Sequence, residues 1–312
     1  MKRKAIQMAG KTIVISLPSD WVKKFGIKKG DELELLEKNK KLEISIGRLT
    51  ELKKILNLDL SNESDKIIKH TVSILHKIGF DELHIKYKND SQFKILEEVI
   101  NSMLLGYEIL DKSQNTCLVK SITKIDEAEL NNVIKKTFFV ILECSRTFVE
   151  IIKNESFNKL DEIKDYELKN NKLTNYCHRI INKLHEEQGS ELSYCYLILW
   201  ELENVCDEFK YMANFFKTNP KGLKDFKEKL PLVIQTDRLI NSYYDLFYKF
   251  NSVQLDEFIN NCNSAQLSLQ NNLNKKLSKE AYFLIFSLLA ITTRLKSLVG
   301  SVMILDYLRK NN

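Results

Sequence analysis

The 312-residue sequence predicts a mixed fold: a small β-rich N-terminal part, a small α/β layer, and then a mainly helical region with two tandem three-helix bundles. Three observations lead to this prediction. β-Branched residues alternate with polar ones near the N-terminus, as they do in half-buried strands. Of only 9 Gly, six lie at or before Gly106, and only 3 Pro occur, so helix breakers are rare afterwards. From about residue 126 onward, apolar residues recur at helical spacing.

The overall composition is that of a soluble globular chain, with 44% hydrophobic and 29% charged residues. The longest uncharged apolar run, Ala281–Ile291, is about half of the ~20 residues that a membrane span needs. No apolar signal segment follows the basic N-terminus, so we expect a cytoplasmic protein without a membrane span. The six Cys form no C-x-x-C pair, which predicts reduced thiols in the core.

The positive charge of the chain is concentrated at its N-terminus. Residues 1–48 contain twelve Lys or Arg and six Asp or Glu, while residues 49–312 contain 36 of each. The whole formal net charge of +6 therefore comes from the first 48 residues. A local cationic excess of this kind is typical of a surface that binds an anionic polymer.

The first 48 residues predict a short helix between two pairs of strands. The pattern predicts strands over 5–8 and 13–17, a helix with Ser19 as its N-cap and Gly26 just past its end, and alternating strands around Leu33–Leu35 and Leu42–Ile46. So few residues rarely bury a core alone, and this part has no disulfide pattern or metal-binding pattern. An intertwined dimer would supply the missing core and join two basic faces.

The string G-K-T-I-V-I-S-L-P-S-D-W-V-K-K-F-G-I-K-K-G-D-E-L-E-L, Gly10–Leu35, resembles the AbrB/SpoVT/MazE swapped-hairpin family. That resemblance implies an obligate dimeric β-barrel that binds DNA through basic residues of its N-terminal hairpin and nearby loops. In this sequence those residues are Lys2, Arg3, Lys4 and Lys11, with Lys23 and Lys24 on the helix as second candidates. One Arg in the cluster predicts mostly phosphate contacts and little base readout. The alternative is that these Lys only solvate the surface of a chain that contains 41 Lys.

Residues 49–125 predict a small α/β linker domain. Helices are expected around Ile67–Ile78 and Phe93–Leu104, with a strand at 82–87 between them and two strands at 107–110 and 117–122 after them. No G-x-G-x-x-G or Walker sequence occurs, so we expect no nucleotide site. The expected role of this domain is to connect or to dimerise.

The helical region predicts six helices in two sets, residues 126–218 and 225–312, separated by Asn219-Pro220-Lys221-Gly222. The expected helices are 127–154, 160–187, 190–217, 231–250, 253–275 and 279–309. In the last, Leu284, Leu288, Ile291, Leu295, Leu298, Val302 and Leu305 alternate spacings of four and three, the pattern of a packing stripe in a left-handed bundle. We therefore predict two tandem three-helix bundles.

Acidic and amide side chains are paired on two helices of the first bundle. Glu203 and Asp207 lie at i and i+4 beside the apolar stripe, and Glu167 and Asn171 repeat this spacing on the preceding helix. Antiparallel packing would bring the four together as a site for a divalent or iron-type metal ion. The alternative is an ordinary solvated acidic edge.

The string L-E-N-V-C-D-E-F-K-Y-M-A, Leu202–Ala213, resembles the PhoU motif L-E-R-I-x-D-x-x-x-x-I-A, and E-L-K-N-N at Glu167–Asn171 resembles its acidic partner. Two tandem three-helix bundles are also the PhoU architecture. Together with the AbrB-like part, the chain resembles archaeal PhoU-type phosphate regulators. In the second bundle, Arg294 and the Asn residues 260, 261 and 263 stand where that family has acidic ligands, so we expect the second metal site to be lost.

These observations predict a non-enzymatic regulator. The resemblance implies partners that include DNA, a second copy through residues 1–48, and a phosphate transporter or kinase component. The alternative function is a protein–protein adaptor at a phosphate transporter, in which the N-terminal barrel only dimerises. We expect no enzyme because the sequence shows no nucleophile–base pair and no nucleotide loop.

Overall fold

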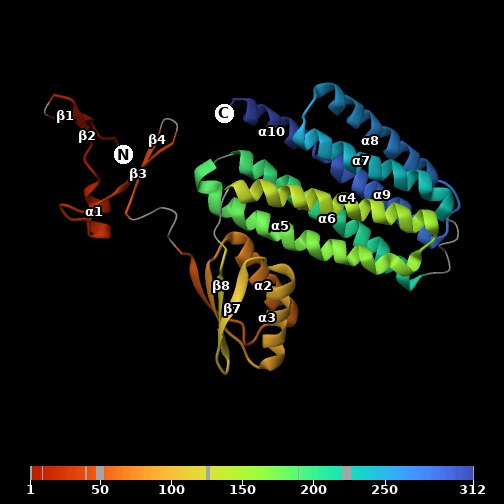
Figure 1. The fold of residues 1–312 in the computed structure, drawn as a ribbon, viewed down its shortest axis with the longest axis horizontal. Helices are drawn as coiled ribbons and strands as arrows, with labels where there is room; N and C mark the ends of the chain where they lie inside the picture. Colours follow the sequence, from red (N-terminus) through yellow and green to blue (C-terminus); the bar gives the residue numbers. More distant parts are fainter. Residues whose placement is uncertain are drawn as a thin grey trace. The chain divides into compact units, whose positions relative to one another are not determined.

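The computed structural model describes residues 2–8, 10–38, 41–46, 53–123, 127–188, 190–219 and 226–311. The chain divides into two compact units, residues 1–53 and 54–312, which we call the N-terminal unit and the C-terminal unit (Figure 1). The mixed fold predicted from the sequence is confirmed: short strands come first, then a small sheet, then mostly helices. The predicted domain ends at 48 and 125 lie outside the described residues.

The N-terminal unit consists of two hairpins with a short helix between them. Its elements are β1 (Ile6–Met8), β2 (Thr12–Val14), α1 (Ser19–Phe25), β3 (Glu34–Lys38) and β4 (Lys41–Ser45). Antiparallel pairing joins β1 to β2 and β3 to β4, in two separate sheets. The four predicted strands and the helix are therefore present, although β2 ends at Val14, three residues before the predicted end.

Helix α1 begins one residue differently from the prediction. Ser19 is the first helical residue, and Pro18 occupies the N-cap position, where its side chain can make no capping hydrogen bond. Gly26 ends the helix as predicted, with a left-handed φ of 66° that a side-chain-bearing residue rarely adopts. The Pro–Gly frame thus fixes both ends of a helix only seven residues long.

The α/β layer of the C-terminal unit is a four-stranded sheet with two helices. Its elements are β5 (Ile55–Asp59), α2 (Asp65–Ile78), β6 (Glu82–Lys86), α3 (Asp90–Met103), β7 (Tyr107–Lys112) and β8 (Thr116–Ser121). The strand order is β5-β6-β8-β7, with β5 parallel to β6 and the other pairs antiparallel. Leu83 and Ile85 of β6 are buried while His84 between them is exposed, so one face of the sheet carries the core.

Five of these six elements were predicted from the sequence, and β5 was not. Its residues Ile-Leu-Asn-Leu-Asp form an edge strand in which exposed and partly buried residues alternate and none is buried. Side-chain caps define the two helices: the Ser64 hydroxyl accepts from Ile67 N, and Asn89 Oδ1 accepts from Gln92 N.

The helical region follows the predicted order closely. Its helices are α4 (Glu127–Asn154), α5 (Leu160–Gln188), α6 (Ser190–Thr218), α7 (Leu230–Tyr248), α8 (Ser252–Leu273), α9 (Lys279–Ser297) and α10 (Val299–Asn311). Figure 1 shows α4, α5 and α6 as one set of long helices and α7, α8 and α9 as the next. The predicted sixth helix is divided into α9 and α10 at Leu298. Buried residues of both sets form one continuous core.

The stripe predicted along the last helix is buried from Leu284 to Leu305, with all seven members at most 2% exposed. By length and composition, the segment Lys279–Lys310 could also cross a membrane, with a mean hydropathy of 1.6 over its most apolar 18 residues. In this structure, however, α9 packs against α6, α7 and α8. Core helices of bundles meet the same criterion, so the segment is not by itself evidence of a membrane span.

All six Cys are unpaired and buried, as predicted for reduced core thiols. Burial raises the pKa of the Cys177 thiol to about 12, which keeps it protonated and unreactive.

Candidate functional site

The basic residues of the first hairpin are all exposed. Lys2, Arg3 and Lys4 precede β1, and Lys11 lies in the turn that joins β1 to β2. Gly10 supports that turn with a φ of 87°, and its carbonyl accepts a hydrogen bond of 2.8 Å from Gln7 Nε2. The hairpin therefore carries its four cations at its open end and at its turn.

Helix α1 carries the two other predicted cations in its last turn. Lys23 and Lys24 are exposed, and the Lys24 ammonium lies 5.4 Å from the centre of the Phe25 ring. Within the described ranges, no ion pair joins any of the six predicted DNA-binding cations to a carboxylate. Their charge is therefore available to an external anion.

The described residues of the same unit form no buried core. Every fully buried residue of the described chain lies at or after Leu60. The N-terminal unit instead exposes Ile13 by 69%, Leu35 by 59%, and six further large apolar residues: Ile6, Met8, Ile15, Phe25, Leu42 and Ile46. An exposed set of this size on so small a unit marks an interaction surface.

The predicted acidic cluster of the first bundle gathers only in part. Glu167 and Asn171 on α5 are 5% and 8% exposed, and Asn171 Nδ2 donates to Glu167 Oε1 over 2.6 Å. Lys210 of α6 inserts its ammonium between the helices, 2.7 Å from Glu167 Oε1 and 2.6 Å from Asp207 Oδ1. Burial opposes the charge of Lys210, but its hydrogen bonds to Asp207 and Glu167 prevail and raise its pKa.

Glu203, the fourth predicted ligand, turns to other partners. Its Oε2 accepts a 3.2 Å hydrogen bond from Thr174 Oγ1 and lies 3.9 Å from the Lys77 ammonium. Burial raises the pKa of the Glu203 carboxyl, and Lys77 partly opposes this shift. Three of the four predicted residues therefore meet, and Glu203 belongs to a separate contact with α2.

This arrangement does not fit a metal ion. Lys210 already supplies the positive charge between the two carboxylates, and the one buried oxygen of the cluster left without a hydrogen-bond partner is Asn171 Oδ1. Divalent cations such as Ca²⁺ take six or more oxygen ligands. Among the residues that the structure describes, no group of three or more His, Cys, Asp or Glu could hold a metal. The metal stays a prediction of the sequence that these side chains do not support.

In the second bundle, the residues at the corresponding positions do not form a ligand set. Arg294 of α9 lies 3.0 Å from Glu201 Oε2 and 4.0 Å from Glu208 Oε1, both on α6. The three asparagines of α8, residues 260, 261 and 263, are exposed. Arg294 therefore serves as an ion-pair partner between the two helical sets.

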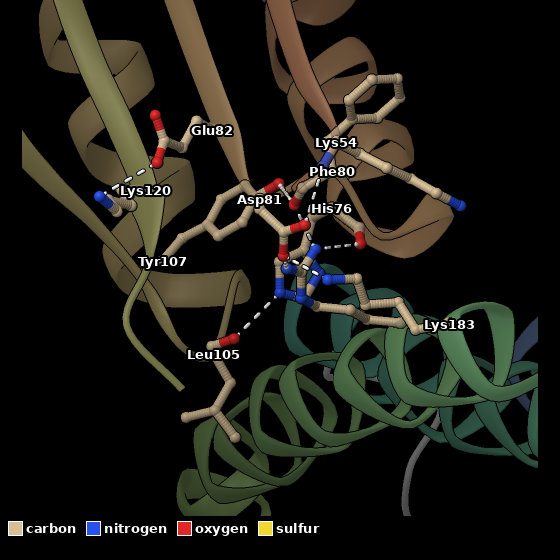
Figure 2. Close-up of polar contacts among 10 residues, drawn as sticks. Lys54, His76, Phe80, Asp81, Glu82, Leu105, Tyr107, Lys120 and Lys183 are labelled. Carbon is tan, nitrogen blue, oxygen red and sulfur yellow. Dashed lines mark hydrogen bonds and ion pairs between the residues drawn. The ribbon is translucent and has the colours of Figure 1, made fainter. Parts of the chain in front are cut away.

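A buried charged junction joins the α/β layer to the bundle. Asp81, just before β6, accepts hydrogen bonds from Arg179 Nη2 at 3.1 Å and from the Lys183 ammonium, both on α5. Its other oxygen accepts from Lys54 N at 3.0 Å, so it also holds the start of the C-terminal unit (Figure 2). Gly79 allows the close approach: it has a φ of 95°, and an added Cβ would lie 2.7 Å from Lys183 Cγ.

The surroundings of the junction are neutral and hydrogen-bonded. Burial lowers the pKa of His76 to about 3, so the ring is neutral and its Nε2 donates to the Leu105 carbonyl over 2.9 Å (Figure 2). Tyr107 Oη donates to the Phe80 carbonyl over 2.7 Å, and the fully buried Arg179 guanidinium lies 5.1 Å from the Tyr107 ring centre. The junction therefore holds the beginning of the C-terminal unit firmly against α5.

Lys210, Asp81 and Arg179 are the residues that the sequence reasoning missed. Lys210 had a signal, because it lies three residues after Asp207 on the same helix. Asp81 and Arg179 are 98 residues apart, so their pairing has no local signal.

Comparison with known families agrees with the N-terminal geometry. Residues 6–46 match the family model described as "Antidote-toxin recognition MazE, bacterial antitoxin". These residues form a MazE/AbrB-like domain. The resemblance of Gly10–Leu35 to this family is thereby confirmed, and a domain of this kind indicates DNA-binding or antitoxin-type regulation. The search of curated proteins and the search of solved structures gave no match.

Proposed function

We propose that the protein is a cytoplasmic transcription regulator that binds DNA as a dimer and has no enzymatic activity. In this proposal its helical region senses a signal or binds a partner. The observation that carries it is the combination found in the MazE/AbrB-like domain: an apolar surface without a core, beside six cations without carboxylate partners in the described chain.

A second copy of the chain is the partner that best fits the apolar surface. The exposed residues come from both hairpins and from α1, so a matching unit interlaced with this one would cover all of them at once. The dimer would also bring twelve of the predicted DNA-binding cations together. Such a surface neutralises phosphates of a duplex, and the loss of condensed counterions from DNA drives the binding.

Salt dependence of DNA binding tests the proposal. Each phosphate contact contributes roughly −0.9 to the slope of log K against log salt. We expect Lys4→Gln, which removes two cations per dimer, to make the slope shallower by about 1.8 for every sequence tested. The matched control is Lys94→Gln on α3, an exposed residue far along the chain, and it should leave the slope unchanged. Fluorescence anisotropy with labelled duplex measures both.

The alternative function is an adaptor, in which the N-terminal domain only dimerises. The observation that favours it is the sheer number of Lys, 41 in the whole chain, because many of them serve only solubility. A dimeric protein that shows no binding to any duplex at low salt would overturn the regulator proposal and support the adaptor.

Phosphate is the signal that we propose for the helical region. Support comes from the likeness of Leu202–Ala213 to the PhoU motif and from the successive sets of helices α4–α6 and α7–α9. The partner would then be a phosphate transporter or a kinase component. Genome-wide occupancy should differ between phosphate-replete and phosphate-starved cells, with sites near phosphate-uptake genes. Occupancy that is equal in the two conditions would remove phosphate as the signal and leave DNA binding intact.

A further inference from the structure

A pocket of about 360 Å³ opens where the turn between α3 and β7 meets α4 and α5. We call it the lysine-rimmed pocket. Its lining residues are Leu105, Lys136, Phe139, Val140, Lys169, Lys172 and Leu173. The volume falls in the range of ligand pockets, about 300–1,000 Å³. The pocket takes no part in the DNA-binding surface, the acidic cluster or the charged junction.

Three of the seven residues that line the pocket are lysines. Lys169 and Lys172 lie at i and i+3 on α5, so their side chains share one face of the helix. Lys136 adds a third ammonium from α4. In the described part of the chain none of the three is paired with a carboxylate: Lys172 donates to the Asn101 carbonyl at 3.1 Å, and Lys169 lies near the Tyr166 ring. Since residues 49–312 have no net charge, this concentration is local.

The floor of the pocket is apolar. Val140 of α4, Leu173 of α5 and Leu105 are half-buried, and Phe139 is 46% exposed. Apolar surface left in contact with water costs roughly 25 cal/mol per Å² relative to covering it. An occupant of this pocket therefore gains from an apolar body as well as from a negative head.

We propose that the lysine-rimmed pocket binds a small amphiphilic anion, with a phosphate or carboxylate head and a short acyl chain. The three ammonium groups would hold the head, and the chain would lie on Leu105, Val140 and Leu173. An inorganic anion alone would leave this floor uncovered. A partner helix would need a long groove, because its diameter with side chains is about 10–12 Å. This site would give the helical region an effector beyond the proposed DNA binding.

The position of Leu105 gives such a ligand a structural consequence. Its side chain lines the pocket, and its carbonyl accepts the hydrogen bond from His76 next to the charged junction (Figure 2). A ligand on this turn would therefore steady the backbone that surrounds Arg179 and Asp81. We expect slower amide hydrogen exchange at residues 104–107 in the bound protein.

The test is calorimetric titration of the full-length protein with decyl phosphate and with decanoate, each below its micelle concentration. We expect saturable binding of one ligand per chain for both. Lys136→Gln, Lys169→Gln and Lys172→Gln should each weaken binding about tenfold, and Phe139→Ala should weaken it about threefold. The matched control Lys94→Gln should bind as the wild type does. Each variant is checked for an unchanged unfolding midpoint.

Four outcomes would overturn the proposal. If inorganic phosphate binds as tightly as decyl phosphate, the apolar floor contributes nothing to binding. If decanol binds as tightly as decyl phosphate, the lysines contribute nothing to binding. Binding to phosphatidylglycerol vesicles without binding to free decyl phosphate would show a membrane surface contact instead. Absence of saturable binding would exclude the site. The DNA-binding proposal stands or fails separately, since it depends only on the N-terminal unit.

Discussion

The N-terminal and C-terminal units differ in how much of their apolar surface they bury. The described residues of the N-terminal unit include none that is fully buried, whereas the C-terminal unit packs two cores, one in the α/β layer and one through the helices. The two units also differ in whether their charged side chains are paired. The six predicted DNA-binding cations of the N-terminal unit have no carboxylate partner among the described residues, while the buried Arg179 and the half-buried Lys210 of the C-terminal unit are held by carboxylates. The contrast agrees with the proposal that a second copy of the chain completes the first unit.

The largest expected effect comes from changing the exposed apolar surface of the N-terminal unit. Ile13→Glu should abolish dimerisation and with it DNA binding, because a carboxylate would be buried in the interface. Leu267→Glu on α8 is the matched control, since Leu267 is 59% exposed and Ile13 is 69% exposed. Light scattering after size-exclusion chromatography measures the molar mass of both variants. If the wild type is a monomer, or if Ile13→Glu still forms a dimer, the exposed apolar residues of the N-terminal unit are not a dimer interface.

The next largest effect concerns the charged junction. Asp81→Ala leaves the fully buried Arg179 without its carboxylate, which we expect to destabilise the C-terminal unit by about 3–5 kcal/mol. Glu98→Ala removes an exposed ion pair with Lys69 and should cost at most about 1 kcal/mol. Urea unfolding followed by circular dichroism measures the two. Equal midpoints for the two variants would show that the junction is not a stabilising element.

A smaller effect is expected at the acidic cluster. Lys210→Ala leaves Glu167 and Asp207 without the cation between them, and we expect a loss of about 1–3 kcal/mol. Mn²⁺ should then raise the unfolding midpoint of the variant and not that of the wild type, because in the wild type Lys210 already supplies the cation between the two carboxylates. If Mn²⁺ stabilises the wild type to the same extent, the lysine does not replace a metal ion.

The smallest effect near neutral pH is a pH dependence from the buried histidines of the C-terminal unit, which contains all five His of the chain. Burial lowers the pKa of His76 and of His178 to about 3, against about 6.5 in the unfolded chain. The unfolded state therefore binds more protons below pH 6.5, so stability falls as the pH drops from about 6.5 toward 3. Each histidine contributes a slope of at most about 1.4 kcal/mol per pH unit.

His76→Gln should flatten this dependence between pH 7 and pH 5, measured by urea unfolding at each pH. The exposed His70 provides the control, because His70→Gln should leave the dependence as it is in the wild type. Identical pH profiles for wild type and His76→Gln would show that burial of the His76 ring is not the source of the dependence.

Local sequence signals predicted most of the secondary structure. The strand–helix–strand order of the first 46 residues and the apolar stripe of α9 and α10 depend on near neighbours in the chain. Strand β5 alternates too, but it was not predicted; it has only five residues, lies at the edge of the sheet and contains no buried residue. The division of the last helix at Leu298 was also invisible, since the apolar spacing continues through it.

The sequence by itself determined the cationic N-terminal domain, its resemblance and the run of long helices, because charge, turn residues and periodicity are local properties. Only the tertiary structure decided which ions pair. Asp81 meets Arg179 and Lys183, Lys210 stands between Glu167 and Asp207, and three lysines line one apolar pocket. Each of these groups includes residues from separate elements, and the packing of the helices sets the distances between them to within a few ångströms, a precision that residue spacing along the chain does not contain.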